Sequence, residues 1–263
     1  MQIILNADDF GKSPSRNKAI DTSFKQGLIR SAGLIVTGPY LDEAVALMEA
    51  GGYHKQIHIH FNLSTNLLAE GSEDMPQTEA MKTDPFFCKN GKFLPYHGLP
   101  RSFFSIFKWG NVYLEMVAQF EKFKLVTKGE ADYSHIDFHL WYNLTWPVSV
   151  ALRRFTRKYK IKSVRYLGIH QRDTFRNKLY CYVSGDPHVK YIPASNIDYY
   201  LSKKQLFEEY PLVELYCHPN YKNGILLDDS PSYLKHERQP LTVHFQKLID
   251  TGDDIRFLSW GEI

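Results

Sequence analysis

The sequence has few cysteines, and none of them lies in a closely spaced pair. Cys88, Cys181 and Cys217 are far apart along the 263 residues. Zinc sites made of cysteine usually contain closely spaced pairs, and small secreted domains that depend on disulfides contain many more cysteines. The cysteine content therefore argues against a cysteine zinc site and against a disulfide framework.

The chain also lacks a long hydrophobic run. No apolar stretch approaches the roughly 20 residues that a membrane-spanning helix needs. Residues 1–9 contain neither the basic region nor the apolar region of a secretory signal. We therefore expect a cytoplasmic protein without a membrane span.

No excess of charge of one sign is present. The chain has 32 lysines and arginines against 29 acidic residues, a net charge of +3. Its nearest approach to a basic cluster has a spacing typical of the solvent-facing side of a helix, and consists of Arg153, Arg154, Arg157, Lys158, Lys160 and Lys162. We therefore expect no nucleic-acid partner.

Strand and helix signals alternate along most of the chain. Strands are predicted at 2–6, 32–37, 56–61, 133–138, 162–166, 212–217 and 254–258, and helices at 14–26, 41–51, 111–127, 147–159, 203–209 and 240–250. Strands that alternate with helices pair in parallel through right-handed crossovers. The pattern predicts an α/β protein, with about seven mostly parallel strands in an irregular or incomplete (β/α) barrel. An open doubly wound sheet is the alternative.

Two segments interrupt this alternation, and we expect both to be irregular insertions in a single domain of residues 1–263. Residues 66–100 contain an Asn90-Gly91 pair that predicts a small hairpin. Residues 168–200 are rich in tyrosine. Long irregular segments near an active site commonly determine which substrate is bound.

Acidic residues and histidines gather at the C-terminal ends of four predicted strands. They are, in chain order, Asp8 and Asp9, then His58 and His60, then His135, Asp137 and His139, and finally His218. In a parallel barrel these strand ends share one mouth, where active sites are built. Each segment alone has an ordinary explanation as a turn, a pair of core histidines or a polar strand edge. Together they predict a functional site.

Two of these imidazoles and one of the neighbouring aspartates predict a catalytic metal centre. Such a ligand set leaves a position open for water, whose pKa a bound ion lowers towards ~7. Imidazole ligands favour zinc or another transition ion, with magnesium as the alternative. His58, His135 and Asp137 are expected to support the ligands, because a carboxylate between imidazoles can fix the tautomer of a ligand.

Four motifs resemble the YdjC-like carbohydrate deacetylases and occur in the same order. They are NADDFG at 6–11, HFNLS at 60–64, SHIDFH at 134–139 and ELYCHP at 214–219. Further similarities are Asn17, the stretches 27–31 and 88–93, and Arg238, so that the resemblance extends over nearly the whole chain.

The resemblance implies a distorted (β/α) barrel related to polysaccharide deacetylases. It implies hydrolysis of the N-acetyl group of an N-acetylated mono- or oligosaccharide such as a chitooligosaccharide, and a homodimer is suggested by the family. Asp9, His60 and His139 match the metal ligands of the family, and Asp8 matches its general base.

In the implied mechanism, Asp8 removes a proton from a metal-activated water, and this water attacks the acetamide carbonyl. His218 is expected to protonate the leaving amine. Arg165, at the end of a predicted strand, is expected either to orient Asp8 or to lie at the surface. Where the family often has further histidines, this chain has Trp141 and Asn143, which would change the contacts to the sugar.

Two other functions remain open from the sequence. Asp8 and Asp137 could be the paired acids of a glycosidase, and the changes at Trp141 and Asn143 fit a sugar-binding protein without catalysis. A zinc deaminase is disfavoured, because its HxE and PCxxC motifs are absent.

Overall fold

The computed structural model describes residues 2–64, 75–95, 103–139, 145–165, 190–194, 212–230, 238–250 and 254–263, with single positions between 175 and 201. The expected helix at 203–209 and most of the expected insertion at 168–200 lie outside the described residues.

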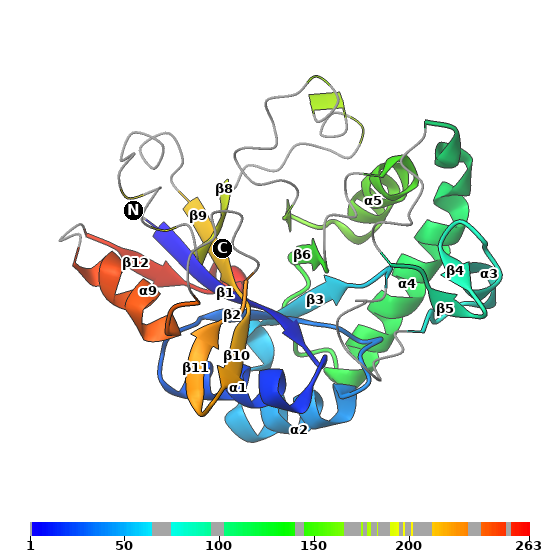
Figure 1. The fold of residues 1–263 in the computed structure, drawn as a ribbon. Coiled ribbons are helices and arrows are strands. Elements are labelled where there is room, and N and C mark those ends of the chain that lie inside the picture. The colour runs from blue at the N-terminus through cyan, green and yellow to red at the C-terminus, as the bar shows by residue number, and fades with distance from the viewer. Residues whose placement is uncertain are drawn as a thin grey trace.

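One curled parallel sheet forms the centre of the fold (Figure 1). Its strands lie in the order β7-β6-β3-β2-β1-β9-β8, and β12 also pairs with β1. All of its pairings are parallel. The strands are β1 (Gln2–Phe10), β2 (Ser31–Leu34), β3 (Ile57–Phe61), β6 (His135–Phe138), β7 (Ser163–Val164), β8 (Lys190–Pro193), β9 (Leu212–Cys217) and β12 (Arg256–Leu258).

The sheet forms a half-barrel, which confirms the predicted α/β fold in its incomplete form. Among the described residues no pairing joins β7 to β8. At the other end of the chain, β12 pairs with β1 at residues 2–4, on the edge opposite β9. The same edge of β1 pairs with β2 farther along, from Asn6 to Phe10.

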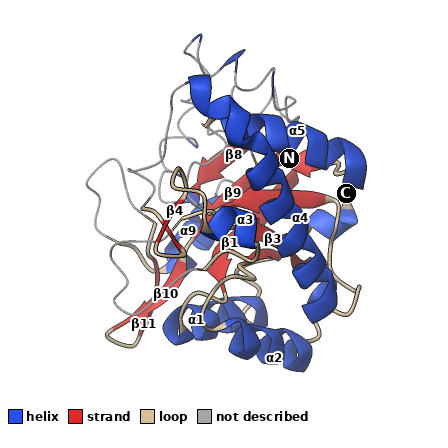
Figure 2. Ribbon diagram, turned by 90° about the vertical axis from the view of Figure 1, so that its right-hand side faces the viewer, coloured by secondary structure: helices blue, strands red, loops and turns tan. Residues whose placement is uncertain are grey.

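Helices surround the sheet in separate groups (Figures 1 and 2). The helices are α1 (Pro14–Lys25), α2 (Leu41–Gly51), α3 (Glu79–Lys82), α4 (Trp109–Val126), α5 (Trp146–Tyr159) and α9 (Leu241–Ile249). Short 3-10 turns occupy His54–Gln56, Phe103–Lys108 and Trp260–Glu262. The pairs α1–α2 and α4–α5 each pack together, while α9 lies near β12. No described helix is both long and apolar enough to cross a membrane.

The predicted ends of the first two helices are confirmed by their capping contacts. The Ser13 side chain accepts a hydrogen bond from the Arg16 backbone N–H at 3.3 Å, and Pro14 is the first helical residue of α1. Helix α2 ends before Gly52, whose positive φ of 69° suits a left-handed C-terminal cap.

Two small antiparallel hairpins lie outside the main sheet. The predicted hairpin at Asn90-Gly91 joins β4 (Cys88–Lys89) to β5 (Lys92–Phe93), and φ is positive at both turn residues. A second hairpin joins β10 (Pro219–Lys222) to β11 (Ile225–Asp228) through Asn223 and Gly224. The second hairpin was not predicted, although its turn has the same Asn-Gly signal.

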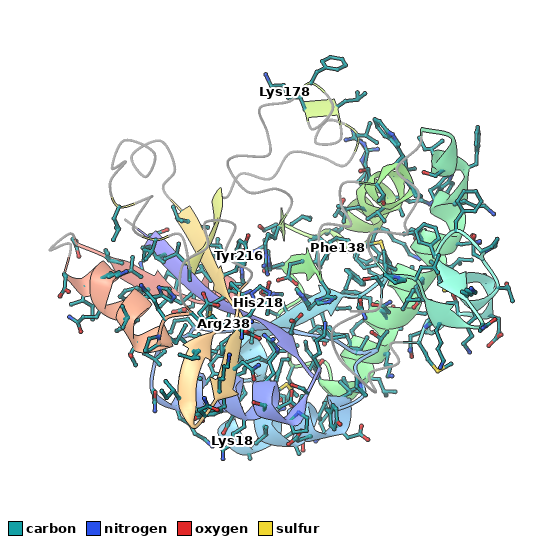
Figure 3. All side chains as sticks on the ribbon, in the orientation of Figure 1. Lys18, Phe138, Lys178, Tyr216, His218 and Arg238 are labelled. Atoms are coloured by element: carbon teal, nitrogen blue, oxygen red, sulfur yellow. The ribbon has the colours of Figure 1, made fainter. Side chains whose placement is uncertain are left out.

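Apolar side chains fill the space between the sheet and the surrounding helices (Figure 3). Near the C-terminus, Trp260 is only 2% exposed, and its ring stacks on His135 with centroids 3.6 Å apart and an angle of 4° between the rings. Its backbone N–H donates to the Ser31 hydroxyl at 3.1 Å. The C-terminal turn is thereby fixed against the strands that carry the polar cluster.

We expect Trp260→Ala to lower the free energy of unfolding by about 3–5 kcal/mol, because a large buried ring is replaced by a cavity. Chemical denaturation of both proteins measures the difference. Ile263→Ala is the matched control, since Ile263 is 48% exposed in the same C-terminal segment. Equal unfolding midpoints for Trp260→Ala and the unchanged protein would contradict this role.

Candidate metal centre

The backbone at the end of β1 turns two neighbouring carboxylates towards one cluster. Successive residues of a strand normally face opposite sides of the sheet. Here the register of β1 with β2 shifts between Ala7 and Phe10, and Asp9 has a left-handed φ of 72°. This bulge breaks the alternation, so that the buried side chains of Asp8 and Asp9 both join the polar cluster. The strand thus continues through both residues, which were expected to follow it.

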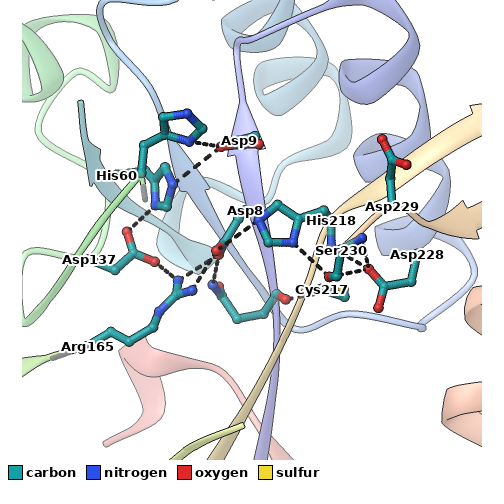
Figure 4. Close-up of polar contacts among 12 residues, drawn as sticks. Asp8, Asp9, His60, Asp137, Arg165, Cys217, His218, Asp228, Asp229 and Ser230 are labelled. Carbon is teal, nitrogen blue, oxygen red and sulfur yellow. Dashed lines mark hydrogen bonds and ion pairs between the residues drawn. The ribbon is translucent and has the colours of Figure 1, made fainter. Parts of the chain in front are cut away.

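Asp9, His60 and His139 converge from three strand ends, and Figure 4 shows His60 beside Asp9. Asp9 Oδ1 lies 2.6 Å from His139 Nδ1 and 3.4 Å from His60 Nε2. One potential ligand atom from each residue lies within 4.8 Å of the other two, and all three residues are buried. His60 Nε2 makes no hydrogen bond to any described residue. A buried nitrogen without a hydrogen bond, beside a carboxylate and a second imidazole, fits a divalent cation.

Asp137 fixes the orientation of the two histidines of β3. Its Oδ1 lies 2.6 Å from His60 Nδ1, and its Oδ2 lies 3.0 Å from His58 Nε2. His60 and Asp137 are partners in the β3–β6 register, which places their side chains next to each other. The hydrogen bond to Nδ1 leaves His60 Nε2 directed at Asp9. Among the described residues, Asp137 therefore contacts His58 and His60 of β3 rather than the histidines of its own segment.

The space beneath His60 exists because β2 carries a glycine at this point. A Cβ atom on Gly33 would lie 2.9 Å from His60 Cβ and 3.0 Å from His60 Nδ1. Any larger residue would push the imidazole away from Asp137 and Asp9. A small residue in β2 is therefore part of the geometry of the centre.

Arg165 neutralises the carboxylates on the other side of the cluster. Its guanidinium donates to both oxygens of Asp8, at 2.5 and 2.6 Å, and also contacts Asp137. Its Nε lies 3.3 Å from Glu214 Oε1. Arg165 thus contacts Asp8. Its side chain is only 11% exposed, so the alternative expectation of a surface arginine is wrong.

His218 faces Asp8 from the opposite side, between β9 and β10. Its Nε2 lies 3.7 Å from Asp8 Oδ2. Its Nδ1 lies 2.8 Å from the hydroxyl of Ser230, which donates to Asp228 at 2.6 Å. Because the hydroxyl proton is used on Asp228, Ser230 accepts from His218 Nδ1–H. The other nitrogen, Nε2, is therefore the one that faces Asp8.

Burial and neighbouring charges shift the pKa values of several residues in the cluster. Burial opposes the charged form of His60, but the carboxylates of Asp137 and Asp8 outweigh it and raise the pKa of His60 to about 10. Burial and the nearby ammonium of Lys12 lower the pKa of His139 to about 4. Burial would raise the pKa of Asp9, yet Lys12 and His139 hold it well below its usual range. The cluster therefore favours a positive charge at the position of His60.

Several residues of the cluster carried no role in the sequence analysis. The Lys12 ammonium lies 2.6 Å from His139 Nε2, and Asn6 donates to Asp8 at 2.9 Å. Glu214 is fully buried, and burial raises its pKa to about 8. A lone acid in the apolar strand LVELYC was a usable signal for Glu214. Lys12 gave no such signal, because a lysine after a turn is usually at the surface.

Other combinations of the same side chains fit an ion less well. His58, His135 and Asp137 also lie close enough to share a cation. The guanidinium of Arg165 already contacts Asp137 there, however, and His135 instead stacks on Trp260. A third combination, Asp8 with His60 and Asp137, uses both carboxylates that Arg165 binds. Trp141 and Asn143 lie outside the described residues.

Bacterial carbohydrate deacetylases resemble the chain over most of its length. Carbohydrate deacetylase 2 of Listeria innocua is 26% identical over 236 residues, which cover 88% of this chain and 85% of that protein. A carbohydrate deacetylase of Halalkalibacterium halodurans is 26% identical over 250 residues, which cover 89% of this chain and 91% of that protein.

A solved structure shares the fold. It is the crystal structure of a protein from Enterococcus faecalis, whose description names cellobiose-phosphate cleavage. It superposes on this chain with a TM-score of 0.63 at 22% sequence identity. The superposition covers 84% of this chain and 82% of that one. At this identity the similarity shows the fold alone.

The family resemblance seen in the motifs is confirmed across the chain. The model of the YdjC-like protein family matches residues 2–244, and so includes every strand end that contributes to the cluster. The chain belongs to the YdjC-like protein family.

Proposed function

We propose that the protein is a metal-dependent carbohydrate deacetylase, which hydrolyses the N-acetyl amide of an amino sugar or chitooligosaccharide. The observation that carries the metal is the convergence of Asp9, His139 and the unbonded Nε2 of His60. The relatives named carbohydrate deacetylases support the reaction. The proposed enzyme is a single domain of residues 1–263, because β12 near the C-terminus pairs with β1 near the N-terminus.

Asp9, His60 and His139 would hold the ion. Two imidazoles and a carboxylate favour zinc or another transition ion, and magnesium is the alternative. When bound, such an ion polarises the carbonyl to be attacked and makes water more acidic. Asp137 keeps the Nδ1 proton of His60 engaged, so that Nε2 presents a lone pair to the ion.

Asp8 would act as the general base. Arg165 and Asn6 hold its carboxylate in one orientation, while Asp8 and Asp9 are neighbours on one bulged strand. A carboxylate fixed beside the ion can take a proton from water as the water attacks the acetamide carbon. Arg165 is a positioning residue in this scheme.

His218 would act as the general acid for the leaving amine. The hydrogen bond to Ser230 fixes the ring of His218. Its Nε2 faces the carboxylate of Asp8, which would also contact the attacking water. A proton that Asp8 receives thus has a neighbouring imidazole through which it can reach the amine nitrogen of the sugar. The side chain of His218 is 19% exposed, so a substrate can approach it.

The arrangement does not favour the glycosidase alternative. The paired acids of a glycosidase flank the sugar bond with room for substrate between them. Asp8 and Asp137 instead both contact the guanidinium of Arg165. The space between these two carboxylates is therefore filled by a side chain.

We expect the purified protein to contain a near-stoichiometric transition ion, and His60→Ala and His139→Ala to lose most of it. Each substitution removes one of the three side chains that would hold the ion. Elemental analysis after dialysis measures the content. His54→Ala, on the 3-10 turn just before β3, should keep the ion. Full metal content in both site variants would disprove the ligand assignment.

Asp8→Asn should lower the rate of acetate release from diacetylchitobiose by about 10²–10⁴-fold, since general base catalysis contributes this much. Metal content should stay unchanged, because Asp8 is not among the proposed ligands. A coupled acetate assay measures the rate. Wild-type rates for Asp8→Asn would refute the general base, and release of free sugar without acetate would support a glycosidase.

A further inference from the structure

A basic pocket lies on the helical side of the molecule, on elements that contribute none of the proposed ligands. It has a volume of about 340 Å³ and lies at α4 and α5, lined by Trp109, Val150, Arg153, Arg154, Arg157 and Val183. The volume falls within the range of small-molecule sites. Half of the lining residues are arginines, and none is acidic.

Aromatic rings hold one of these arginines in place. The Arg154 guanidinium carbon lies 5.4 Å from the Trp109 ring centroid and 5.5 Å from that of Tyr113. Contact with two rings restricts the movement of the guanidinium, and its N–H groups remain able to donate hydrogen bonds. An arginine held in this way loses little conformational entropy when it binds an anion.

Helices α4 and α5 supply no carboxylate to Arg154 or Arg157. Helix α5 contains four basic residues and no acidic one. Helix α4 contains two acids, and both are engaged elsewhere. Glu115 is buried and accepts hydrogen bonds from Thr78, and Glu121 pairs with Lys124 at 2.7 Å. In the part of the chain that the structure describes, no ion pair involves Arg154 or Arg157.

We propose that this pocket binds a small molecule that carries a phosphate monoester. Guanidinium groups bind phosphate through paired N–H donors. A phosphate monoester carries about −1.5 to −2 charge at neutral pH, which matches several arginines better than the single charge of a carboxylate. Trp109 and Val150 offer apolar contacts to the rest of the molecule. This site is independent of the proposed deacetylase activity.

Calorimetric titration of the metal-loaded protein with phenyl phosphate tests the proposal, with benzoate as the carboxylate analogue. We expect phenyl phosphate to bind, and the double variant Arg154→Gln/Arg157→Gln to weaken it by at least about tenfold, because charge-assisted hydrogen bonds are lost. Arg256→Gln, which removes an exposed arginine of β12, is the matched control and should bind as the unchanged protein does.

Three outcomes would overturn the proposal. Phenyl phosphate fails to bind at millimolar concentration, benzoate binds equally well, or the double variant binds phenyl phosphate with unchanged affinity. The last result would show that the anion binds elsewhere on the protein. Arg157→Gln alone provides a second test if the double variant unfolds, because Arg157 is exposed and has no described ring contact. It should also weaken binding, and unchanged affinity in this variant would count against the pocket.

Discussion

Burial of several carboxylates at one end of a parallel sheet is the constraint on which the rest of the site depends. Asp8, Asp9 and Asp137 are all at most 3% exposed, and buried carboxylates are stable only when positive charge or hydrogen bonds compensate them. Arg165 supplies one fixed positive charge to Asp8 and Asp137. Even so, the carboxylates of Asp137 and Asp8 raise the pKa of His60 to about 10, so the cluster still favours a cation beside that imidazole. A divalent ion at this point would compensate the negative charge of the carboxylates, as the proton on His60 does in its absence.

The half-barrel brings these charged residues together through the arrangement of its strands. Parallel strands bring their C-terminal ends to one mouth, and the β3–β6 register sets His60 beside Asp137. The positive φ of Asp9 adds a second carboxylate from the same strand, since a regular strand would direct Asp8 and Asp9 to opposite faces. Backbone conformations of this strained kind are common at functional sites.

The sequence predicted those parts of the site that follow from strand periodicity. His58 and His60 are two residues apart in a β-strand, so it was predictable that they lie on the same side of it, and both contact Asp137 there. Tertiary partners from distant segments were not. Nothing in the sequence places Lys12 against His139, or stacks Trp260 on His135. The fold was predicted well where strands and helices alternate. The β10–β11 hairpin was not predicted, because each of its strands is four residues long and mostly half-buried or exposed, so that no clear apolar alternation marks them.

The arginines of this protein show the same electrostatic rule in two opposite settings. Arg165 is surrounded by carboxylates and is almost fully engaged by them, so it has little capacity left for a ligand, and in the proposed mechanism it orients Asp8. Arg154 is held by aromatic rings without a described carboxylate, so its donors remain available. A guanidinium gains most from an anion when its position is already fixed and its charge is not yet neutralised. By that criterion Arg165 stabilises the buried carboxylates of the candidate metal centre, whereas Arg154 is available to the proposed phosphate ligand.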